Sequence, residues 1–259
     1  MRALAIHWNL DPVMFSLGDH VFRWYSVLQT AAIILAWFFT FWWARREHVR
    51  REALVPLMFW VLVAFFAGGK LGFRYFYATG SFSGLSIFGA AVAIFLVMWV
   101  YSMTTGKRYD MSFLWFSDRL MLYGFFLVMT RIGNFCNSEL YGTPTDLPWG
   151  VIFDRVDSVT RHPVQLYEAA AFLVLFCVTL WLYLKRLDKM HRGFLAGLNI
   201  TAAALIRFLL EFFKVSKKNI DFGNFSLHTA QVLCIPLFLF GLGILLYVRR
   251  HPVPSRLRK

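Results

Sequence analysis

Cysteine is scarce in this sequence of 259 residues: there are 3, namely Cys136, Cys177 and Cys234, and they lie far apart. None belongs to a C-x-x-C pair, so neither a disulfide framework nor a metal site built from cysteines is expected. Cys177 and Cys234 lie within apolar runs, where a free cysteine packs like a small hydrophobic side chain. The sequence therefore predicts no bound metal and no other cofactor.

Internal repeats, low-complexity tracts and a separate soluble domain are also missing. With 59% hydrophobic and 19% aromatic residues, the chain is too apolar for a soluble domain, whose surface must be mostly polar. Several stretches reach or approach the roughly 20 residues that cross the hydrocarbon core as a helix. They are residues 21–44, 54–78, 85–104, 112–130, 164–184, 194–215 and 226–248. The predicted fold class is all-α: an integral membrane protein with seven transmembrane helices.

Acidic residues are few, since 27 Lys and Arg stand against 14 Asp and Glu, a net charge of +13. Nucleic-acid-binding proteins share such a charge, but here the basic residues alternate from loop to loop. More than half of them lie in the loops after the first, third, fifth and seventh predicted spans. By the positive-inside rule this side is cytoplasmic, which places the N-terminus outside and the C-terminus inside. We interpret the basic runs as topology signals and expect no nucleic-acid partner.

The segments outside the predicted spans are short. Residues 1–20 lack a continuous apolar region and a small-residue cleavage site, so we expect an interfacial segment and not a removable signal peptide. Residues 132–163, rich in Pro, Asp and Gly, form the one sizeable insertion, and the predicted topology places them on the outer face. We therefore expect a single polytopic membrane domain over residues 1–259, with a small head between the fourth and fifth spans.

Polar side chains gather at the outer ends of the predicted spans. The densest group is "RIGNFCNSELYG", residues 131–142, which carries Arg131, Asn134, Asn137 and Glu139. Further polar residues at these ends are Arg23, Tyr25, Lys70, Arg74, His162, Gln165, Tyr167, Glu168, Arg207, Glu211, His228 and Gln231. Arg207 and Glu211 are four apart and therefore share one helix face. All of these residues fall in the same half of the membrane in the topology that the loop charges indicate.

Unpaired arginines at this depth need an explanation. One Arg near a helix centre costs about 2.5 to 3.5 kcal/mol, so several would offset the stability of a whole fold. Local explanations stay open: an ion pair of Arg207 with Glu211, a capping network around Arg131, and snorkelling of Lys70 and Arg74. One cavity that opens to the outer leaflet and holds a phosphate headgroup explains all of them, because the planar guanidinium matches phosphate oxygens in pairs.

Read together, "RIGNFCNSELYG", "RHPVQLYEA" and "RFLLEFFK" resemble the prolipoprotein diacylglyceryl transferase family. The resemblance covers nearly the whole chain, from "FSLGDHVFRWYSV" through "GGKLGFRYFY" to "LHTAQVLCIP". It implies seven spans, an external N-terminus and an arm and head that face the periplasm. It also implies a multi-pass protein of the bacterial cytoplasmic (inner) membrane, with its active face toward the periplasm.

The resemblance implies a reaction. The diacylglyceryl group of phosphatidylglycerol, or of another anionic phospholipid, would be transferred to the lipobox cysteine thiol of a prolipoprotein signal peptide, with release of glycerol phosphate. Such a transfer needs cations on the departing phosphate and help in deprotonating the thiol, because the thiolate is the nucleophile. Carried over from the family, Arg131 and Arg207 would hold the phosphate, and Asn134 and Tyr25 would orient lipid oxygens.

The remaining site residues follow from the same family motifs. Glu139 and Glu211 would position the arginines, and a buried acid with a raised pKa could also serve as a base. Asn137, Gly142 and Gln165 complete the expected substrate-binding set. Catalysis is assigned to Arg131, Arg207, Glu139 and His162.

Two departures from the family pattern stand out. The family has a His-Gly-Gly motif whose histidine is the expected base, but this chain has "SIFGAA", with Phe88 in that place. Ala203 replaces a tyrosine one turn before Arg207. Phe88 cannot transfer a proton, so we expect another base, His162 or Glu139, or a thiolate generated by the arginine field alone.

Two alternatives stay open. A catalytically impaired homologue would bind phospholipid or a lipoprotein partner as a subunit of a membrane assembly. A transporter or channel for anions would also suit an arginine-lined cavity. Against the second, no row of charged residues is visible through the cytoplasmic half of the predicted spans.

Overall fold

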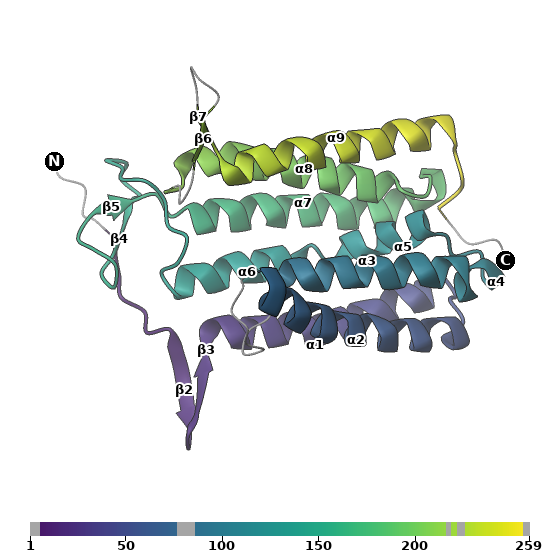
Figure 1. Ribbon diagram of the computed structural model, residues 1–259, viewed down its shortest axis with the longest axis horizontal. Helices are drawn as coiled ribbons and strands as arrows, with labels where there is room; N and C mark the ends of the chain where they lie inside the picture. Colours follow the sequence, from purple (N-terminus) through teal and green to yellow (C-terminus); the bar gives the residue numbers. More distant parts are fainter. Residues whose placement is uncertain (1–5, 77–85, 216–218, 222–225, 256–259) are drawn as a thin grey trace.

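The computed structural model describes residues 6–76, 86–215, 219–221 and 226–255, and this part of the chain is mostly helical. The bundle consists of α1 (Trp24–Arg46), α2 (Arg51–Phe76), α3 (Ile87–Met103), α5 (Phe113–Leu120), α6 (Phe125–Cys136), α7 (Val164–Arg186), α8 (Phe194–Leu210) and α9 (Thr229–Arg250). Short helical turns add α4 (Thr105–Arg108), η1 (Met121–Tyr123), η2 (Leu187–Lys189) and η3 (Glu211–Phe213). Figure 1 shows the long helices running side by side along the molecule.

Helix length and composition fit a multi-pass membrane protein. Among the described residues, six helices are long and apolar enough to cross a bilayer: Trp24–Arg46, Arg51–Tyr75, Phe113–Cys136, Val164–Lys189, Phe194–Phe213 and Thr229–Arg250. Large apolar side chains such as Phe38 and Leu239 are mostly exposed on the outside of the bundle, where lipid would cover them. The predicted third span corresponds to α3, whose apolar part, Gly89–Met103, is shorter than these six.

The helix of the predicted fourth span extends further than its apolar run. α5 continues through η1 into α6, which ends only at Cys136. Arg131 and Asn134 therefore lie within a helix and not in the loop that follows it. The chain leaves the helix at Asn137 and Ser138, where the backbone of Ser138 has a left-handed φ of 56°.

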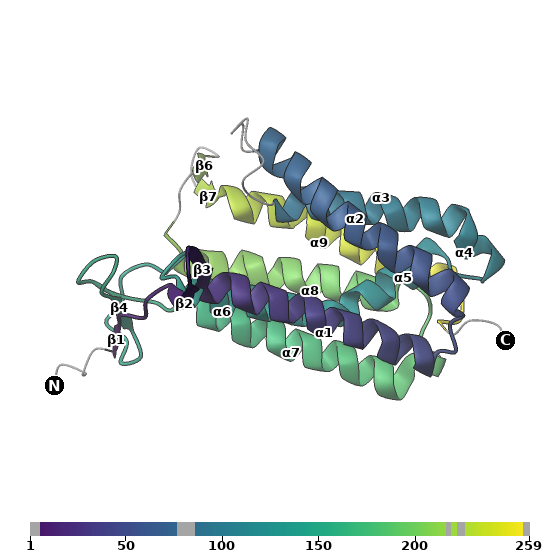
Figure 2. The same ribbon diagram turned by 90° about the horizontal axis from the view of Figure 1, so that it is seen from below.

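Two helix pairs pack with especially close backbones. α2 lies against α3, where a Cβ atom on Gly72 would come within 2.6 Å of the Cα of Gly89. α8 lies against α9, where a Cβ on Gly197 would meet the carbonyl of Gly241 at 3.1 Å. Small residues at such positions let helix backbones approach. Figure 2 shows α2 diverging from α1 toward the end of the bundle that carries the strands.

The strands form a small head at that end. β1 (Ile6–Trp8) pairs in parallel with β4 (Val151–Phe153), which pairs antiparallel with β5 (Thr160–Arg161). Two hairpins, β2 (Val13–Leu17) with β3 (His20–Arg23) and β6 (Asn219–Asp221) with β7 (Ser226–His228), complete the strands that the structure describes. The indole of Trp8 donates to the carbonyl of Phe135 at 3.1 Å, which ties the head to the end of α6. In the head, the hydrogen bond from Arg161 holds the pKa of the Asp157 carboxyl below its ordinary value.

The opposite end of the bundle carries the loops that follow α1 and α7 (Figure 1). A buried polar network lies there. Buried charged residues occur at this end. Arg119 binds Glu47 and the carbonyl of Ser255, while the Asp118 carboxylate accepts the N–H groups of Gly193 and Ala196 at the start of α8. These charges are neutralised by local partners, so they do not form a row that leads through the bundle.

Candidate active site

A buried carboxylate lies at the centre of the polar cluster. Glu168, in the second turn of α7, has a side-chain exposure of 0%. Its Oε2 lies 3.1 Å from Nε of Arg131 on α6, and its Oε1 lies 2.9 Å from Nη1 of Arg207 on α8. Nζ of Lys214, just after η3, also lies 2.9 Å from Oε1. Removing one partner from such a buried group leaves an uncompensated charge and costs about 3 to 5 kcal/mol.

Glu211 extends the cluster toward α9. Its Oε2 lies 3.4 Å from Nη2 of Arg207 and 3.9 Å from Nζ of Lys214. Its Oε1 lies 3.9 Å from Nδ1 of His228, the residue that precedes α9. Arg207 and Glu211 do share one helix face, but the shorter contact of Arg207 is with Glu168 on the neighbouring helix.

The cluster carries a surplus of positive charge. Three cations, Arg131, Arg207 and Lys214, face two carboxylates, Glu168 and Glu211, which leaves a charge of +1 if His228 is neutral. The side chains of Arg131 and Arg207 are 14% and 27% exposed, so both reach open space. A surplus cation in a site of low dielectric constant favours an anionic ligand.

Arg131 is flanked by two further predicted site residues. Its Nη1 donates to Oδ1 of the buried Asn134, three residues further along α6, at 3.3 Å. Tyr25, at the start of α1, packs on the same helix, where a Cβ on Gly133 would come within 2.7 Å of its ring. Glycine at this position therefore lets the Tyr25 ring lie directly against α6, beside Arg131 and Asn134.

The chain between α6 and α7 contains the other predicted residues. Glu139 accepts two hydrogen bonds. Nε2 of Gln165 donates to its backbone carbonyl at 2.6 Å, and Nδ2 of Asn137 donates to its side-chain carboxylate at 3.3 Å. The Gly142 N–H donates to the carbonyl of His162 at 2.9 Å, and a Cβ on Gly142 would come within 2.6 Å of that oxygen. These contacts fasten the loop after α6 onto the start of α7.

Glu139 and His162 lie at the edge of this arrangement. The Glu139 carboxylate is exposed, accepts a hydrogen bond from Asn137 and interacts electrostatically with Tyr25, while the backbone carbonyl of Glu139 accepts from Gln165. His162 is buried, with Nδ1 3.3 Å from the hydroxyl of Tyr167 and its ring 5.2 Å from that of Phe213. The structure therefore brings together Arg131, Asn134, Arg207 and Glu211, with Tyr25 beside them, and places Glu139 and His162 outside that group.

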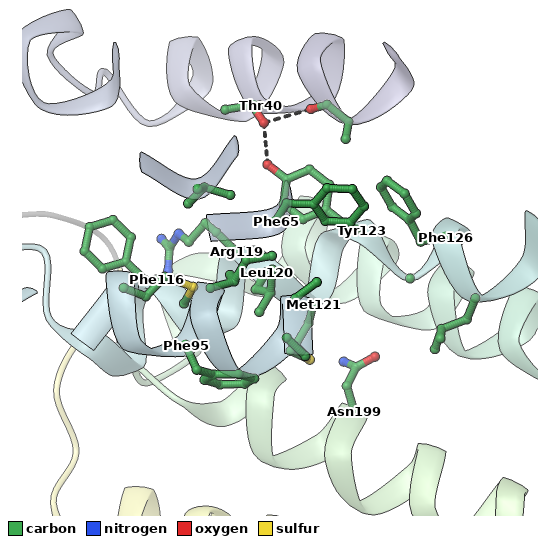
Figure 3. Close-up of a pocket in the computed structure, with 18 of the residues that line it drawn as sticks. Thr40, Phe65, Phe95, Phe116, Arg119, Leu120, Met121, Tyr123, Phe126 and Asn199 are labelled. Atoms are coloured by element: carbon green, nitrogen blue, oxygen red, sulfur yellow. Dashed lines mark hydrogen bonds between the residues drawn. The ribbon is translucent and has the colours of Figure 1, made fainter. Parts of the chain in front are cut away.

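An apolar cavity lies directly beneath the ionic cluster. It encloses about 520 Å³ between α1, α2, α3 and the helices from α5 to α8. Leu127, Phe172 and Ala203 line it, and each lies one helical turn from Arg131, Glu168 or Arg207 on the same helix. Figure 3 shows residues that line this cavity, among them Arg119 and the hydrogen-bonded pair Thr40 and Tyr123. A charged entrance above an apolar chamber fits an amphiphile with an anionic head.

Sequence reasoning did not assign roles to three members of the cluster. They are Glu168 in "RHPVQLYEA", Lys214 in "RFLLEFFK" and His228 in "LHTAQVLCIP". The signal available for Glu168 was an acidic residue near the start of an apolar span, where an ionisable side chain indicates a functional site. The side chain of Phe88 lies outside the described residues, whereas Ala203 lies on the cavity wall.

Comparison with known proteins agrees with the motifs. The family model for prolipoprotein diacylglyceryl transferase matches residues 12–247. The phosphatidylglycerol–prolipoprotein diacylglyceryl transferase of Tolumonas auensis is 32% identical over 257 residues, which cover 93% of this chain and 96% of the relative. The enzymes of the same name from Bacteroides fragilis and Gluconobacter oxydans are 30% and 32% identical, and the matches cover 94% of this chain and 95% and 94% of those enzymes. The chain belongs to the prolipoprotein diacylglyceryl transferase family.

Proposed function

We propose that the protein transfers the diacylglyceryl group of phosphatidylglycerol to the lipobox cysteine thiol in the signal peptide of a prolipoprotein. The names of the relatives supply the lipid and protein substrates. The single observation that carries the proposal is the meeting of Arg131 and Arg207, from two helices, on opposite oxygens of the buried Glu168. This geometry holds two guanidinium groups side by side above an apolar chamber that suits acyl chains.

The arginines have free donors for a phosphodiester. Arg131 donates one Nη1 proton to Asn134, while its Nε lies 3.1 Å from Glu168 without forming a hydrogen bond. Arg207 donates one proton of each Nη group to Glu168 and Glu211. A guanidinium has five N–H donors, so each arginine retains some for phosphate oxygens. Glu168 and Glu211 therefore fix the orientation of the arginines without using all of their donors.

The reaction places a second negative charge on the phosphate. The thiolate sulfur attacks the glycerol CH₂ carbon of the diacylglyceryl group, a C–S bond forms, and the C–O bond to phosphate breaks. The bonding electrons go to the phosphate oxygen of the departing glycerol phosphate. The surplus cation of the cluster stabilises that developing charge, the kind of electrostatic effect that dominates many catalysed reactions.

Other residues position the lipid and the chain around it. In this proposal Tyr25 and Asn134 orient lipid oxygens, and Gly142, Asn137 and Gln165 shape the rim through the contacts between α6 and α7. Glu139 and His162 are the bases that the sequence nominates. No metal or cofactor takes part in this scheme.

The proposed topology has seven spans, with α3 as the third, an external N-terminus and a cytoplasmic C-terminus. The ends of α1, α7 and α9, with their basic residues, lie at one end of the bundle, and the head lies at the other (Figure 1). The ionic cluster lies near the start of α7, at the head end, and this arrangement supports the orientation under the positive-inside rule. The active face would then lie toward the periplasm of the bacterial inner membrane.

The test is an assay of the purified protein in bilayers that contain phosphatidylglycerol, with a synthetic lipobox peptide and mass spectrometry of the thioether product. Wild-type protein should form the product, and Arg131→Ala should reduce the rate by about 100-fold or more, as expected for loss of a charge-stabilising group. Arg249→Ala, an exposed residue at the other end of α9, is the matched control. Phospholipid binding without any product from the wild type would favour the impaired-homologue alternative.

A further inference from the structure

His228, which precedes α9 and received no role in the sequence analysis, lies beside the ionic cluster. His228 is the last residue of strand β7 and the N-cap of α9, where its backbone N–H donates to Oε1 of Gln231 at 2.9 Å; its Nδ1 lies 3.9 Å from Oε1 of Glu211. Its side chain is 21% exposed. Among the described histidines, it is the one with an ion-pair contact to the cluster, because the contact of His7 is with Asp154 in the head.

We propose that His228 is the general base of the reaction and that Glu211 is its positioning residue. This inference rests on the proposed function and deepens it. An imidazole with one nitrogen toward a carboxylate can accept a proton at the other nitrogen, and the carboxylate orients the ring and stabilises the imidazolium. Glu211 also contacts Arg207 at 3.4 Å, so the same carboxylate links the base to a phosphate-binding arginine.

The other nominated bases are less well placed. Nδ1 of the buried His162 lies 3.3 Å from the hydroxyl of Tyr167, and the residue's backbone N–H and carbonyl are bonded to Thr143 and Gly142. These contacts make His162 part of the connection between the head and α7. Glu139 is exposed and held by Asn137 and Gln165. Within the described part of the chain, no hydrogen bond or ion pair joins either residue to a cation of the cluster, whereas Glu211 lies near both His228 and Arg207.

The proton and electron balance is complete. The Nε2 atom of His228 takes the proton from the lipobox thiol, and the sulfur keeps the electron pair. That pair forms the C–S bond to the glycerol carbon, and the electrons of the broken C–O bond pass to the phosphate oxygen. The imidazolium then gives its proton to the departing phosphate monoester, whose second pKa is about 6, or to water.

Both acidic and basic groups surround His228. The charged groups on the elements packed near it are Glu211 on η3, Arg207 on α8, Lys214 after η3 and Asp221 on the neighbouring strand β6. Glu211 is the nearest of them, with Oε1 3.9 Å from Nδ1 of His228. Arg207 and Lys214 share that carboxylate.

The experiment compares His228→Gln and His228→Ala with the wild type in the bilayer assay, across pH, with phosphatidylglycerol binding measured separately. We expect kcat to fall about 100- to 10,000-fold at neutral pH, the usual contribution of a general base, with phosphatidylglycerol binding retained. The deficit should shrink as the pH rises past the thiol pKa of about 8.5, because the nucleophile then ionises without help. His7→Gln in the head is the matched control and should retain wild-type activity.

A selenocysteine peptide separates a base from a structural residue, because a selenol is already ionised at neutral pH. The variants should act on that peptide nearly as fast as the wild type. A His228→Gln variant with wild-type rate and pH profile, or one equally slow with thiol and selenol, would overturn the proposal while leaving the proposed function standing. An inactive wild type would overturn both. If neither variant folds, the pH dependence of the wild-type transfer rate tests the proposal. A rate that does not fall toward acid pH would contradict an imidazole base.

Discussion

Arg207 donates to Glu168 across the interface between α8 and α7 at 2.9 Å, although an acidic partner on its own helical turn lies 3.4 Å away. The interhelical pair is therefore the tighter one, and it couples the ends of two helices. The same carboxylate holds Arg131 from a third helix. The position of the arginines thus depends on the packing of α6, α7 and α8 and not on any one helix.

Replacement of Glu168 by Gln should disrupt both stability and activity. The amide has the same shape but no charge, which leaves three cations facing only Glu211. Breaking a buried ion pair in this way costs about 3 to 5 kcal/mol. Thermal unfolding in detergent and the transfer assay measure the two effects, and Glu52→Gln, at an exposed site in the first turn of α2, is the control. If Glu168→Gln and Glu52→Gln had the same unfolding temperature and the same transfer activity, Glu168 would not organise the cluster.

Lys214→Met should weaken phospholipid binding, and it should destabilise the fold less than Glu168→Gln does, because Glu168 keeps Arg131 and Arg207 as partners. It lowers the net charge of the cluster from +1 to 0 and removes one charged donor, which is worth about 1.5 to 3 kcal/mol. We expect the KM for phosphatidylglycerol to rise roughly 10- to 100-fold. Lys214→Arg should retain most of the affinity. Lys107→Met, at an exposed site at the opposite end of the bundle, is the control and should leave KM unchanged. A KM for Lys214→Met equal to that of the control would exclude a role of Lys214 in headgroup binding.

Much of the helical architecture could be predicted from the sequence, because apolar length and loop charge are local properties of each segment. The Arg207 and Glu211 contact was predictable for the same reason, since residues four apart on a helix are neighbours. The end of α6 could not be predicted in this way, because the apolar run stops before the helix ends. Arg131 and Asn134 are polar but still belong to the helix. The β1 and β4 pairing joins segments that are far apart in sequence, and neither has a strong strand pattern of its own.

The centre of the site escaped prediction for a physical reason. Several acids lie near the arginines in sequence, and the one that binds both depends on how three helices pack. Glu139 is close to Arg131 along the chain but exposed, whereas Glu168 is distant along the chain and fully buried. The base presents the same difficulty, because His228 reaches the cluster through Glu211 from a helix that begins well after both arginines.

Gly142→Ala should abolish most activity while the helical bundle stays folded. A Cβ at this position would lie 2.6 Å from both the carbonyl oxygen and the Cβ of His162, so the loop must shift away from α7. That shift would displace Glu139 and the hydrogen bond from Gln165. Gly243→Ala in α9 is the matched control, because nothing lies within 4 Å of its Cβ and alanine favours a helix by about 1 kcal/mol. If Gly142→Ala were as active as Gly243→Ala, the loop after α6 would tolerate displacement.

Ile200→Trp should change which acyl chains the protein accepts, if the apolar cavity holds them. Ile200 lies on the cavity wall, two helical turns from Arg207 and on the same face of α8, so a larger side chain there shortens the space beneath the headgroup site. Added bulk in a packed interior costs about 1 to 3 kcal/mol, whereas a preexisting cavity can accept it at the expense of its ligand. The rate with long-chain phosphatidylglycerol should therefore fall relative to the rate with short-chain lipid, while Leu205→Trp, on the outward face of the same helix, should change neither. The ratio of the two rates is the measurement, because a general loss of stability would lower both rates together and leave their ratio as it is in the wild type. An unchanged ratio in a folded, active Ile200→Trp variant would place the acyl chains outside this cavity, against the lipid-facing surface of the bundle.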